Sequence, residues 1–268
     1  MSNKTDISGG VANSGSGEDR AAFGFRDVAV AEKQGLVNQV FDTVATRYDM
    51  MNDAMSGGLH RAWKDAMVAW LAPPRHPRAL WRALDVAGGT ADVAFRIADK
   101  VGANGEVIVA DINTDMLTVG AERDAKRFKP RTPCHFVTAN AEALPLPDNS
   151  VAAYTIAFGI RNVTRRRQAL AEARRVLQRG GRFMCLEFSQ VDLPIVREFY
   201  DVYSFNVIPW LGQQIAGDGE PYRYLVESIR TFPNPGRFAA EMEREGFENV
   251  SVRRLTGGVV AIHSGFKL

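Results

Sequence analysis

The sequence predicts an α/β protein built on a doubly wound, mostly parallel seven-stranded sheet that ends in an antiparallel hairpin. Short apolar runs alternate with amphipathic helical segments from residue 79 to residue 188, as in a parallel sheet covered by helices on both faces. A glycine-rich turn at Gly88-Gly89 follows the first of these runs. Near the end of the chain, two β-type runs flank Thr256-Gly257-Gly258, which is typical of a β-hairpin.

The composition is that of a globular chain. Of its 268 residues, 46% are hydrophobic and 24% are charged, which is far from the composition of disordered chains. The 33 Lys and Arg residues nearly balance the 31 Asp and Glu residues, which argues against a uniformly basic nucleic-acid-binding protein. Cys134 and Cys185 are too few for a disulfide framework, so we expect a reducing, cytoplasmic compartment. No run approaches the roughly 20 apolar residues of a membrane span.

The N-terminal region divides into a tail and a helical part. Residues 1–22 are rich in Gly, Ser and Asn, so we expect a disordered tail, followed by one domain over residues 23–268. Within it, residues 23–78 are expected to contribute two helices that form a lid. Their apolar residues recur at helical spacing, namely Leu36, Val37, Val40, Phe41, Val44 and Tyr48 in the first helix and Trp63, Met67, Trp70 and Leu71 in the second.

The elements of the sheet follow at regular intervals. The expected strands span residues 79–87, 106–110, 135–138, 151–157 and 182–188, and the hairpin strands span 250–255 and 259–266. Helices are expected at 92–100, at 116–128 and over the apolar residues between Ala169 and Leu177, where Thr164 is the expected N-cap.

The turn after the first strand has the chemistry of a ligand site. Asp85 lies at the end of the strand, and Gly88, Gly89 and Thr90 form the turn. Such a turn lets a ligand approach the backbone at a helix N-terminus. The turn lacks the G-x-G-x-x-G pattern of dinucleotide sites. A carboxylate before small residues suits instead a ligand that carries a cationic amino-acid group and no pyrophosphate.

Two later strand ends carry polar groups that suit the nucleoside part of such a ligand. Asp111 ends the second strand, where a carboxylate accepts both hydroxyls of a ribose. Asn140 and Ala141 follow the third strand, and their side-chain amide and backbone N–H offer the donor and acceptor that an adenine edge needs. Since these groups follow successive strands, we predict a nucleoside site at the carboxyl edge of the sheet.

Longer motifs carry a family resemblance. They are VFDTVA (40–45), YDMMND (48–53), MSGGLHR (55–61), LDVAGGTADVA (84–94), ADIN (110–113), NAEALPLPDNS (140–150), TIAFGIRNVT (155–164), RVLQRGGRFMCLEFS (175–189), YDVYSFNVIP (200–209), YRYLVESIRTFP (222–233) and LTGGVVAIHSG (255–265). With these motifs, about residues 36 to 268 resemble the class I S-adenosylmethionine-dependent methyltransferases, and specifically the UbiE-type C-methyltransferases of ubiquinone and menaquinone biosynthesis.

The resemblance implies a cofactor site and a substrate class. Thr90, Asp111, Asn140 and Ala141 would contact S-adenosylmethionine, and Asp85, Gly88 and Gly89 would form the loop around it. Family members methylate a ring carbon of a polyprenylated quinol, 2-polyprenyl-6-methoxy-1,4-benzoquinol or demethylmenaquinol. The insertion at 189–248 would shelter the polyprenyl tail, because it is rich in aromatic and apolar residues such as Tyr200, Tyr203, Phe205, Ile208, Trp210, Tyr222, Tyr224 and Phe232.

Methyl transfer to a quinol carbon needs a group that favours loss of a ring-hydroxyl proton. Arg161 follows the fourth strand, and its guanidinium would stabilise the resulting phenolate or orient a water. Asn162 would hydrogen-bond a quinol oxygen, and Tyr48 would close the site as part of the lid. The four histidines show no metal-ligand spacing, so we predict no metal site.

The chain departs from the family pattern at two places. Ala91 stands where the family usually has glycine, and a Cβ there is harmless only if φ is negative. Arg165 stands where an aspartate is common, and it opens an arginine cluster with Arg166 and Arg167. This cluster is either a solvated helix face or a patch that contacts anionic lipid headgroups at the inner face of the membrane.

Alternatives to the quinol methyltransferase therefore stay open. One is a methyltransferase that acts on another small apolar acceptor. Another is a catalytically silent subunit of a quinone-synthesis assembly, which Ala91 keeps open. We expect no nucleic-acid partner, and the sequence leaves open a homodimer.

Overall fold

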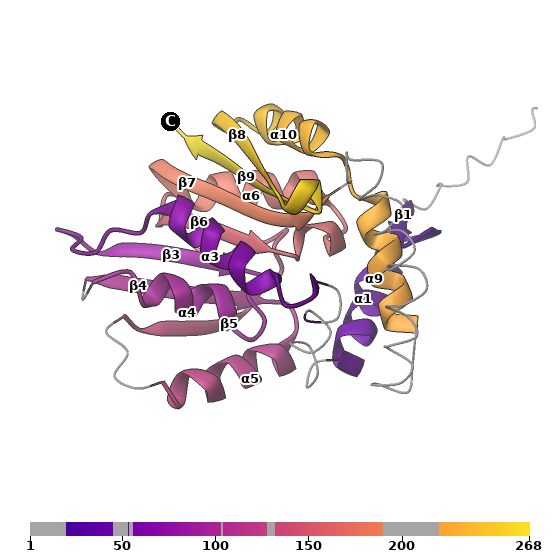
Figure 1. Cartoon of the computed structure of the whole chain (residues 1–268), viewed down its shortest axis with the longest axis horizontal. Coiled ribbons are helices and arrows are strands. Elements are labelled where there is room, and N and C mark those ends of the chain that lie inside the picture. Colours follow the sequence, from indigo (N-terminus) through magenta and orange to yellow (C-terminus); the bar gives the residue numbers. More distant parts are fainter. Residues whose placement is uncertain (1–19, 45–52, 54–55, 103, 128–131, 190–219) are drawn as a thin grey trace, which may run out of the picture.

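The central sheet confirms the expected architecture. The computed structural model describes residues 20–44, 53, 56–102, 104–127, 132–189 and 220–268. Its strands are β3 (Trp81–Val86), β4 (Gly105–Asp111), β5 (Cys134–Thr138), β6 (Val151–Ala157), β7 (Leu177–Phe188), β8 (Glu248–Leu255) and β9 (Val260–Lys267), in the order β5-β4-β3-β6-β7-β9-β8. The pairs from β5 to β7 are parallel, whereas β9 pairs antiparallel with both β7 and β8. The sheet is therefore doubly wound and ends in a hairpin (Figure 1).

Helices cover both faces of this sheet. On one face lie α3 (His60–Leu71), α4 (Asp92–Ala98) and α5 (Thr114–Ala125), and on the other lie α6 (Arg166–Val176) and α10 (Pro235–Arg244). Met67 of α3 and Val93 of α4 are buried in one core cluster, and Leu170 of α6 and Phe238 of α10 are buried in the other. Because both faces are covered, the central strands are apolar throughout rather than alternating.

A hairpin and two helices pack together at one end of the sheet (Figure 1). They are β1 (Arg20–Phe23), β2 (Arg26–Ala29), α1 (Val30–Val44) and α9 (Glu220–Thr231). The rings of Phe23 and Tyr224 stack with their centroids 4.3 Å apart. The predicted tail over 1–22 is thus wrong at its end, since residues 20–22 belong to β1, and residues 23–78 begin with a hairpin before their helices. Phe23, at the end of β1, is buried against Tyr224 of α9.

The end of the second predicted helix and the insertion can be compared with the structure in part. Helix α3 ends at Leu71, and Ala72 adopts the left-handed conformation just before Pro73-Pro74. The insertion contains α9 and α10, while Tyr48 and residues 190–219 lie outside the described residues.

The predicted N-cap at Thr164 is wrong. Helix α6 begins at Arg166 with Arg165 at the N-cap, and the buried Oγ1 of Thr164 has no hydrogen-bond partner. The backbone N–H of Arg165 donates instead to Oε1 of Glu142, at 2.8 Å. A carboxylate from another part of the chain thus accepts from the N–H of the N-cap residue, and the Thr164 hydroxyl does not cap the helix.

Candidate active site

A cleft of about 990 Å³ opens at the carboxyl ends of β3, β4 and β6. All predicted cofactor residues line it, namely Asp85, Gly88, Gly89, Thr90, Asp111, Asn140 and Ala141, together with the predicted catalytic residue Asn162. Helix α1 contributes a further wall through Gln34, Val37 and Asn38. The structure thus brings together residues that are up to about 130 positions apart, because parallel strands end at the same edge of the sheet.

The loop between β3 and α4 is tightly wound. Ala87, Gly89 and Ala91 all have positive φ, at 51°, 49° and 67°. A Cβ on Gly88 would lie 2.7 Å from Cγ1 of Val109 and 3.0 Å from the carbonyl oxygen of Asp85. Ala91 therefore adopts the conformation in which its Cβ is strained, at the N-cap of α4. The loop keeps a glycine-like shape at this position without the glycine.

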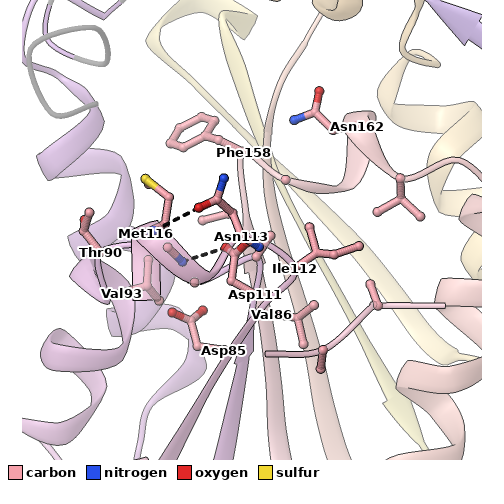
Figure 2. Close-up of a pocket in the computed structure, with 18 of the residues that line it drawn as sticks. Asp85, Val86, Thr90, Val93, Asp111, Ile112, Asn113, Met116, Phe158 and Asn162 are labelled. Atoms are coloured by element: carbon pink, nitrogen blue, oxygen red, sulfur yellow. Dashed lines mark hydrogen bonds between the residues drawn. The ribbon is translucent and has the colours of Figure 1, made fainter. Parts of the chain in front are cut away.

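Asp85 presents a buried carboxyl group to the cleft (Figure 2). Its Oδ1 accepts a hydrogen bond from the hydroxyl of Thr155 at 2.6 Å, whereas its buried Oδ2 has no partner. Burial raises the pKa of Asp85 to about 7, against the opposing effects of the Thr155 hydroxyl and the nearby charge of Lys64. An unpartnered buried carboxylate oxygen is costly, so this atom is a natural site for a cationic group of a ligand.

Asp111 is held in place by the backbone. Its Oδ2 accepts from the N–H of Gly89 and its Oδ1 accepts from the N–H of Asn113, both at 2.9 Å. Burial raises the pKa of Asp111, and these N–H donors act against that shift. Asn113 in turn caps α5 by accepting from the N–H of Met116 (Figure 2). Each oxygen of the Asp111 carboxylate keeps a lone pair that can accept a further hydrogen bond, so the group can bind two neighbouring hydroxyls of a ligand.

The adenine end of the predicted site has apolar walls that sequence reasoning missed. Ile112 and Met116 line the cleft beside Asn140 and Ala141. Oδ1 of Asn140 accepts from the N–H of Glu142 at 2.9 Å, which orients the side-chain amide. The signal for Ile112 was its position directly after Asp111, because a residue there lies at the same strand end.

Polar residues of α1 and α3 were also missed. In α1, the side chain of Gln34 donates to Oδ1 of Asn38 at 2.9 Å, and both residues line the cleft. In α3, Nζ of the buried Lys64 donates to Oδ2 of Asp92 at 2.9 Å. Burial would raise the pKa of Asp92, but Lys64 and Arg96 lower it to about 2. The signal in the sequence was that Asn38 and Lys64 lie between the apolar residues of the two predicted helical segments.

Of the predicted catalytic residues, Arg161 and Asn162 are described, and only Asn162 lines the cleft. Asn162 lines the cleft, and its Oδ1 accepts from the hydroxyl of Tyr224 at 3.0 Å. Arg161 is absent from the described cleft lining, and its Nη1 donates to Oε1 of Glu187 at 2.8 Å and to the carbonyl of Phe158 at 2.6 Å. Phe158 itself lines the cleft with a φ of 57°, which is unusual for a bulky residue. Arg161 thus ties the strained turn of Phe158 to β7.

In the described part of the chain, no three His, Cys, Asp or Glu side chains gather so that they could hold a metal ion. Nε2 of His60 lies 2.9 Å from Oδ1 of Asp53, and Nε2 of His263 lies 3.1 Å from the carbonyl of Pro235. Burial lowers the pKa of His263 to about 4. Both rings therefore have structural partners.

Sequence comparison finds close relatives over almost the whole chain. A protein of Methylobacterium nodulans named "Ubiquinone/menaquinone biosynthesis C-methyltransferase UbiE" is 59% identical over 94% of this chain and 98% of its own length. A protein of the same name from Brucella abortus is 57% identical over 94% and 93%. A sequence profile of the ubiE/COQ5 methyltransferase family matches residues 28–267.

Solved structures share the fold. An S-adenosylmethionine-dependent methyltransferase of Thermotoga maritima, 16% identical, superimposes with a TM-score of 0.61 over 87% of this chain and 100% of its own. Phosphoethanolamine N-methyltransferase 2 of Haemonchus contortus, solved with S-adenosylmethionine, is 14% identical, with a TM-score of 0.55 over 76% of this chain and 52% of its own. These likenesses confirm the predicted fold, and the cleft supplies acidic and amide groups that fit the predicted cofactor. The chain belongs to the ubiE/COQ5 methyltransferase family.

Proposed function

We propose that this chain transfers the methyl group of S-adenosylmethionine to a ring carbon of a polyprenylated quinol in ubiquinone and menaquinone biosynthesis. The acceptor is 2-polyprenyl-6-methoxy-1,4-benzoquinol, demethylmenaquinol or both. Membership of the ubiE/COQ5 family and relatives named for this biosynthesis support the proposal. The observation that carries it is the cleft in which the unpartnered Oδ2 of Asp85 and the backbone-held carboxylate of Asp111 lie at neighbouring strand ends.

Each group of the cleft has a distinct task in cofactor binding. When bound, S-adenosylmethionine supplies an electrophilic methyl group on a sulfonium. The Asp85 carboxylate binds the cationic amino-acid part of the cofactor, and the Asp111 carboxylate accepts hydrogen bonds from the ribose hydroxyls. Asn140 and Ala141 bind the adenine edge, with Ile112 and Met116 as apolar walls.

The quinol side of the reaction requires positioning and help with a proton. A ring carbon must approach the methyl group in line with its bond to sulfur, and holding that geometry lowers the barrier. Asn162 hydrogen-bonds a quinol oxygen from its place at the cleft, oriented by the hydroxyl of Tyr224. Arg161 positions the turn from Phe158 to Asn162, because its charge is already matched by Glu187. A role for Tyr48 stays a prediction.

The test of acceptor chemistry is a quinone profile. A strain in which the gene is deleted is expected to accumulate the demethylated quinone precursor, and the intact chain is expected to restore the methylated product. A chain carrying Asp111→Ala should fail to restore it, because the ribose would lose both acceptors. Accumulation of a demethylated sterol or phospholipid instead would favour another apolar acceptor.

The silent-subunit alternative has its own test. Calorimetric titration with S-adenosylmethionine is expected to give micromolar binding to the intact chain, which excludes that alternative. Absence of binding would favour it.

Membrane contact and assembly stay predictions. Two arginines of the expected cluster pair with carboxylates of the α10 region, Arg166 with Glu241 at 2.6 Å and Arg167 with Glu245 at 2.7 Å. These pairs reduce the positive charge that an anionic lipid would meet. In the ranges that the structure describes, no helix has the length and apolar character to cross a membrane. A peripheral site at the cytoplasmic face, a homodimer and a quinone-synthesis assembly are compatible with the proposal.

A further inference from the structure

A second cavity, which shares only Val163 with the lining of the cofactor cleft, lies between the N-terminal hairpin, α1 and the start of α6. It is open to solvent, has a volume of about 930 Å³ and is lined by residues of β1, α1 and the end of α9 and by the segment from Val163 to Arg166. Five cationic side chains line it, namely Arg20, Lys33, Arg161, Arg165 and Arg166. Such a concentration of one charge in a cavity calls for negative partners.

Three of the five cations have them. The ion pairs are Arg161 with Glu187 at 2.8 Å, Arg165 with Glu142 at 3.7 Å and Arg166 with Glu241 at 2.6 Å. The other two cations hydrogen-bond to backbone carbonyls. Nη2 of Arg20 donates to the carbonyl of Asp27 at 2.6 Å, and Nζ of Lys33 donates to the carbonyl of Val163 at 3.5 Å. Among the residues that the structure describes, these two cations have no carboxylate within ion-pair distance.

Of these two cations, Lys33 gives the stronger indication of a bound anion. It is only 5% exposed, yet its ammonium group, which carries three donors, makes one long hydrogen bond. Burial lowers its pKa, and the charge of Arg166 lowers it further while that of Glu142 raises it. A buried ammonium with so little compensation is strongly unfavourable in isolation.

A neutral donor beside it is also unsatisfied. The hydroxyl oxygen of Thr164, in the residue after the Val163 carbonyl that Lys33 contacts, is buried without any hydrogen-bond partner. Thr164 lines the same cavity. The first residues of α1 and α6, Val30 and Arg166, line it as well, so two helix N-termini with partial positive charge border the same space.

We propose that this cavity binds a phosphate-type oxyanion, with the ammonium of Lys33 and the hydroxyl of Thr164 at its inner end and Arg20 at its rim. An oxyanion supplies an acceptor for the Thr164 hydroxyl, further acceptors for the Lys33 ammonium and a negative charge opposite Lys33 and Arg20. The anion is either free in solution or carried on a lipid headgroup. Lys33, Thr164 and Arg20 are not among the residues that line the methyl-transfer cleft, and the proposed function does not depend on this site.

The test compares the thermal unfolding of four full-length chains in sodium phosphate and in sodium chloride of equal ionic strength. They are the unchanged chain, Lys33→Met, Thr164→Val and Lys100→Met, where Lys100 is an exposed lysine that is not among the cavity-lining residues. A ligand that binds the folded state raises the unfolding temperature with its concentration. The dissociation constant of phosphate follows from that dependence.

We expect phosphate to raise the unfolding temperature of the unchanged chain and of Lys100→Met. In Lys33→Met the dissociation constant of phosphate should rise about tenfold or more, and in Thr164→Val it should rise severalfold. Without phosphate, Lys33→Met should unfold at a higher temperature than the unchanged chain, because it removes a buried charge that lacks a partner. An equal phosphate response in all four chains, or a loss of stability in phosphate-free Lys33→Met, would overturn the proposal.

A flotation experiment separates the two sources of the anion. Vesicles of phosphatidylglycerol and of phosphatidylcholine are mixed with the unchanged chain and with Lys33→Met. Binding to phosphatidylglycerol that Lys33→Met loses and that free phosphate competes away assigns the site to a lipid headgroup. The phosphate-dependent unfolding without such vesicle binding assigns it to a free oxyanion.

Discussion

The guanidinium of Arg161 and the carboxylate of Glu187 form an ion pair at 2.8 Å, with side chains that are only 4% and 1% exposed. The pair joins the turn after β6 to the end of β7. Burial raises the pKa of Glu187 and the charge of Arg161 opposes that rise. Because Arg161 also donates to the carbonyl of Phe158, the pair fixes the turn that carries Phe158 and Asn162 to the cleft.

Removing one partner should be far worse than removing both. Arg161→Met leaves Glu187 buried without its partner and is expected to lower the free energy of unfolding by about 3–5 kcal/mol. The double variant Arg161→Met with Glu187→Leu should recover most of this loss, because no uncompensated charge remains. Urea denaturation of the two variants and the unchanged chain measures the difference.

The same pair of variants distinguishes positioning from a direct role of the guanidinium. If Arg161 holds the turn, Arg161→Met lowers kcat more than it weakens S-adenosylmethionine binding, and the double variant recovers part of kcat. A double variant that is stable but as slow as Arg161→Met would show instead that the guanidinium acts on the quinol oxygen.

Cofactor binding should be linked to a proton at Asp85. Since its pKa is about 7, the carboxyl group is largely protonated below that pH, and a cationic ligand must displace the proton. Affinity for S-adenosylmethionine is expected to fall up to about tenfold per pH unit below pH 7. Calorimetry in buffers of different ionisation enthalpy should detect the proton released, and Asp85→Asn should abolish both the release and the pH dependence. Proton release that persists in Asp85→Asn would assign it to another group.

Asp85 should also make the ligand-free protein less stable as the pH rises. Its pKa is raised from 3.8 to about 7, so between these values the unfolded chain loses the proton while the folded chain keeps it. Its contribution to the free energy of unfolding therefore falls across this window, by at most about 4 kcal/mol. Asp85→Asn should flatten the decline in urea denaturation at pH 5, 6 and 7. A decline as steep as in the unchanged chain would contradict this.

The strain at Ala91 is measurable with a matched pair of substitutions. Ala91 has a φ of 67° at the N-cap of α4, whereas Ala94 lies inside that helix, and both are fully buried. Replacing either with glycine removes the same methyl group and adds the same freedom to the unfolded chain. Ala91→Gly should therefore leave the protein about 2 kcal/mol more stable than Ala94→Gly does. Equal effects in urea denaturation would show that Ala91 is unstrained.

Two helical glycines should respond oppositely to alanine. A Cβ on Gly120 of α5 would lie 2.8 Å from the ring of Phe136 and 3.0 Å from the carbonyl of Gly89. Gly120→Ala is expected to push α5 away from the cofactor loop and weaken S-adenosylmethionine binding about tenfold or more, as measured by calorimetry. Gly35 of α1 has nothing within 4 Å, so Gly35→Ala should stabilise the protein by about 0.5–1 kcal/mol. Unchanged binding in Gly120→Ala would contradict this packing.

The pattern of residues close together in the sequence is sufficient to predict the sheet and much of the cofactor site. Buried parallel strands need continuous apolar runs, and such a run predicted residues 151–157, the bounds of β6. Asp85 and Asp111 follow the same logic. A polar residue at the end of a buried strand faces the crevice wherever strands run parallel, so its position in the sequence already predicts its place in the cleft.

Other features depend on residues that are far apart in the chain. The sequence around Arg166 does not indicate that Glu241, 75 positions away, will be its ion-pair partner. The sequence around Arg161 likewise does not indicate its pairing with the buried carboxylate of Glu187. Thr164 is a residue type that often caps helices, yet the N–H at the start of α6 donates to Glu142 instead. Hydrophobic periodicity is a property of short segments and is legible in the sequence. The partner of a buried charge, and the strain that a tight loop imposes on Ala91 or Phe158, arise only when separate elements pack together.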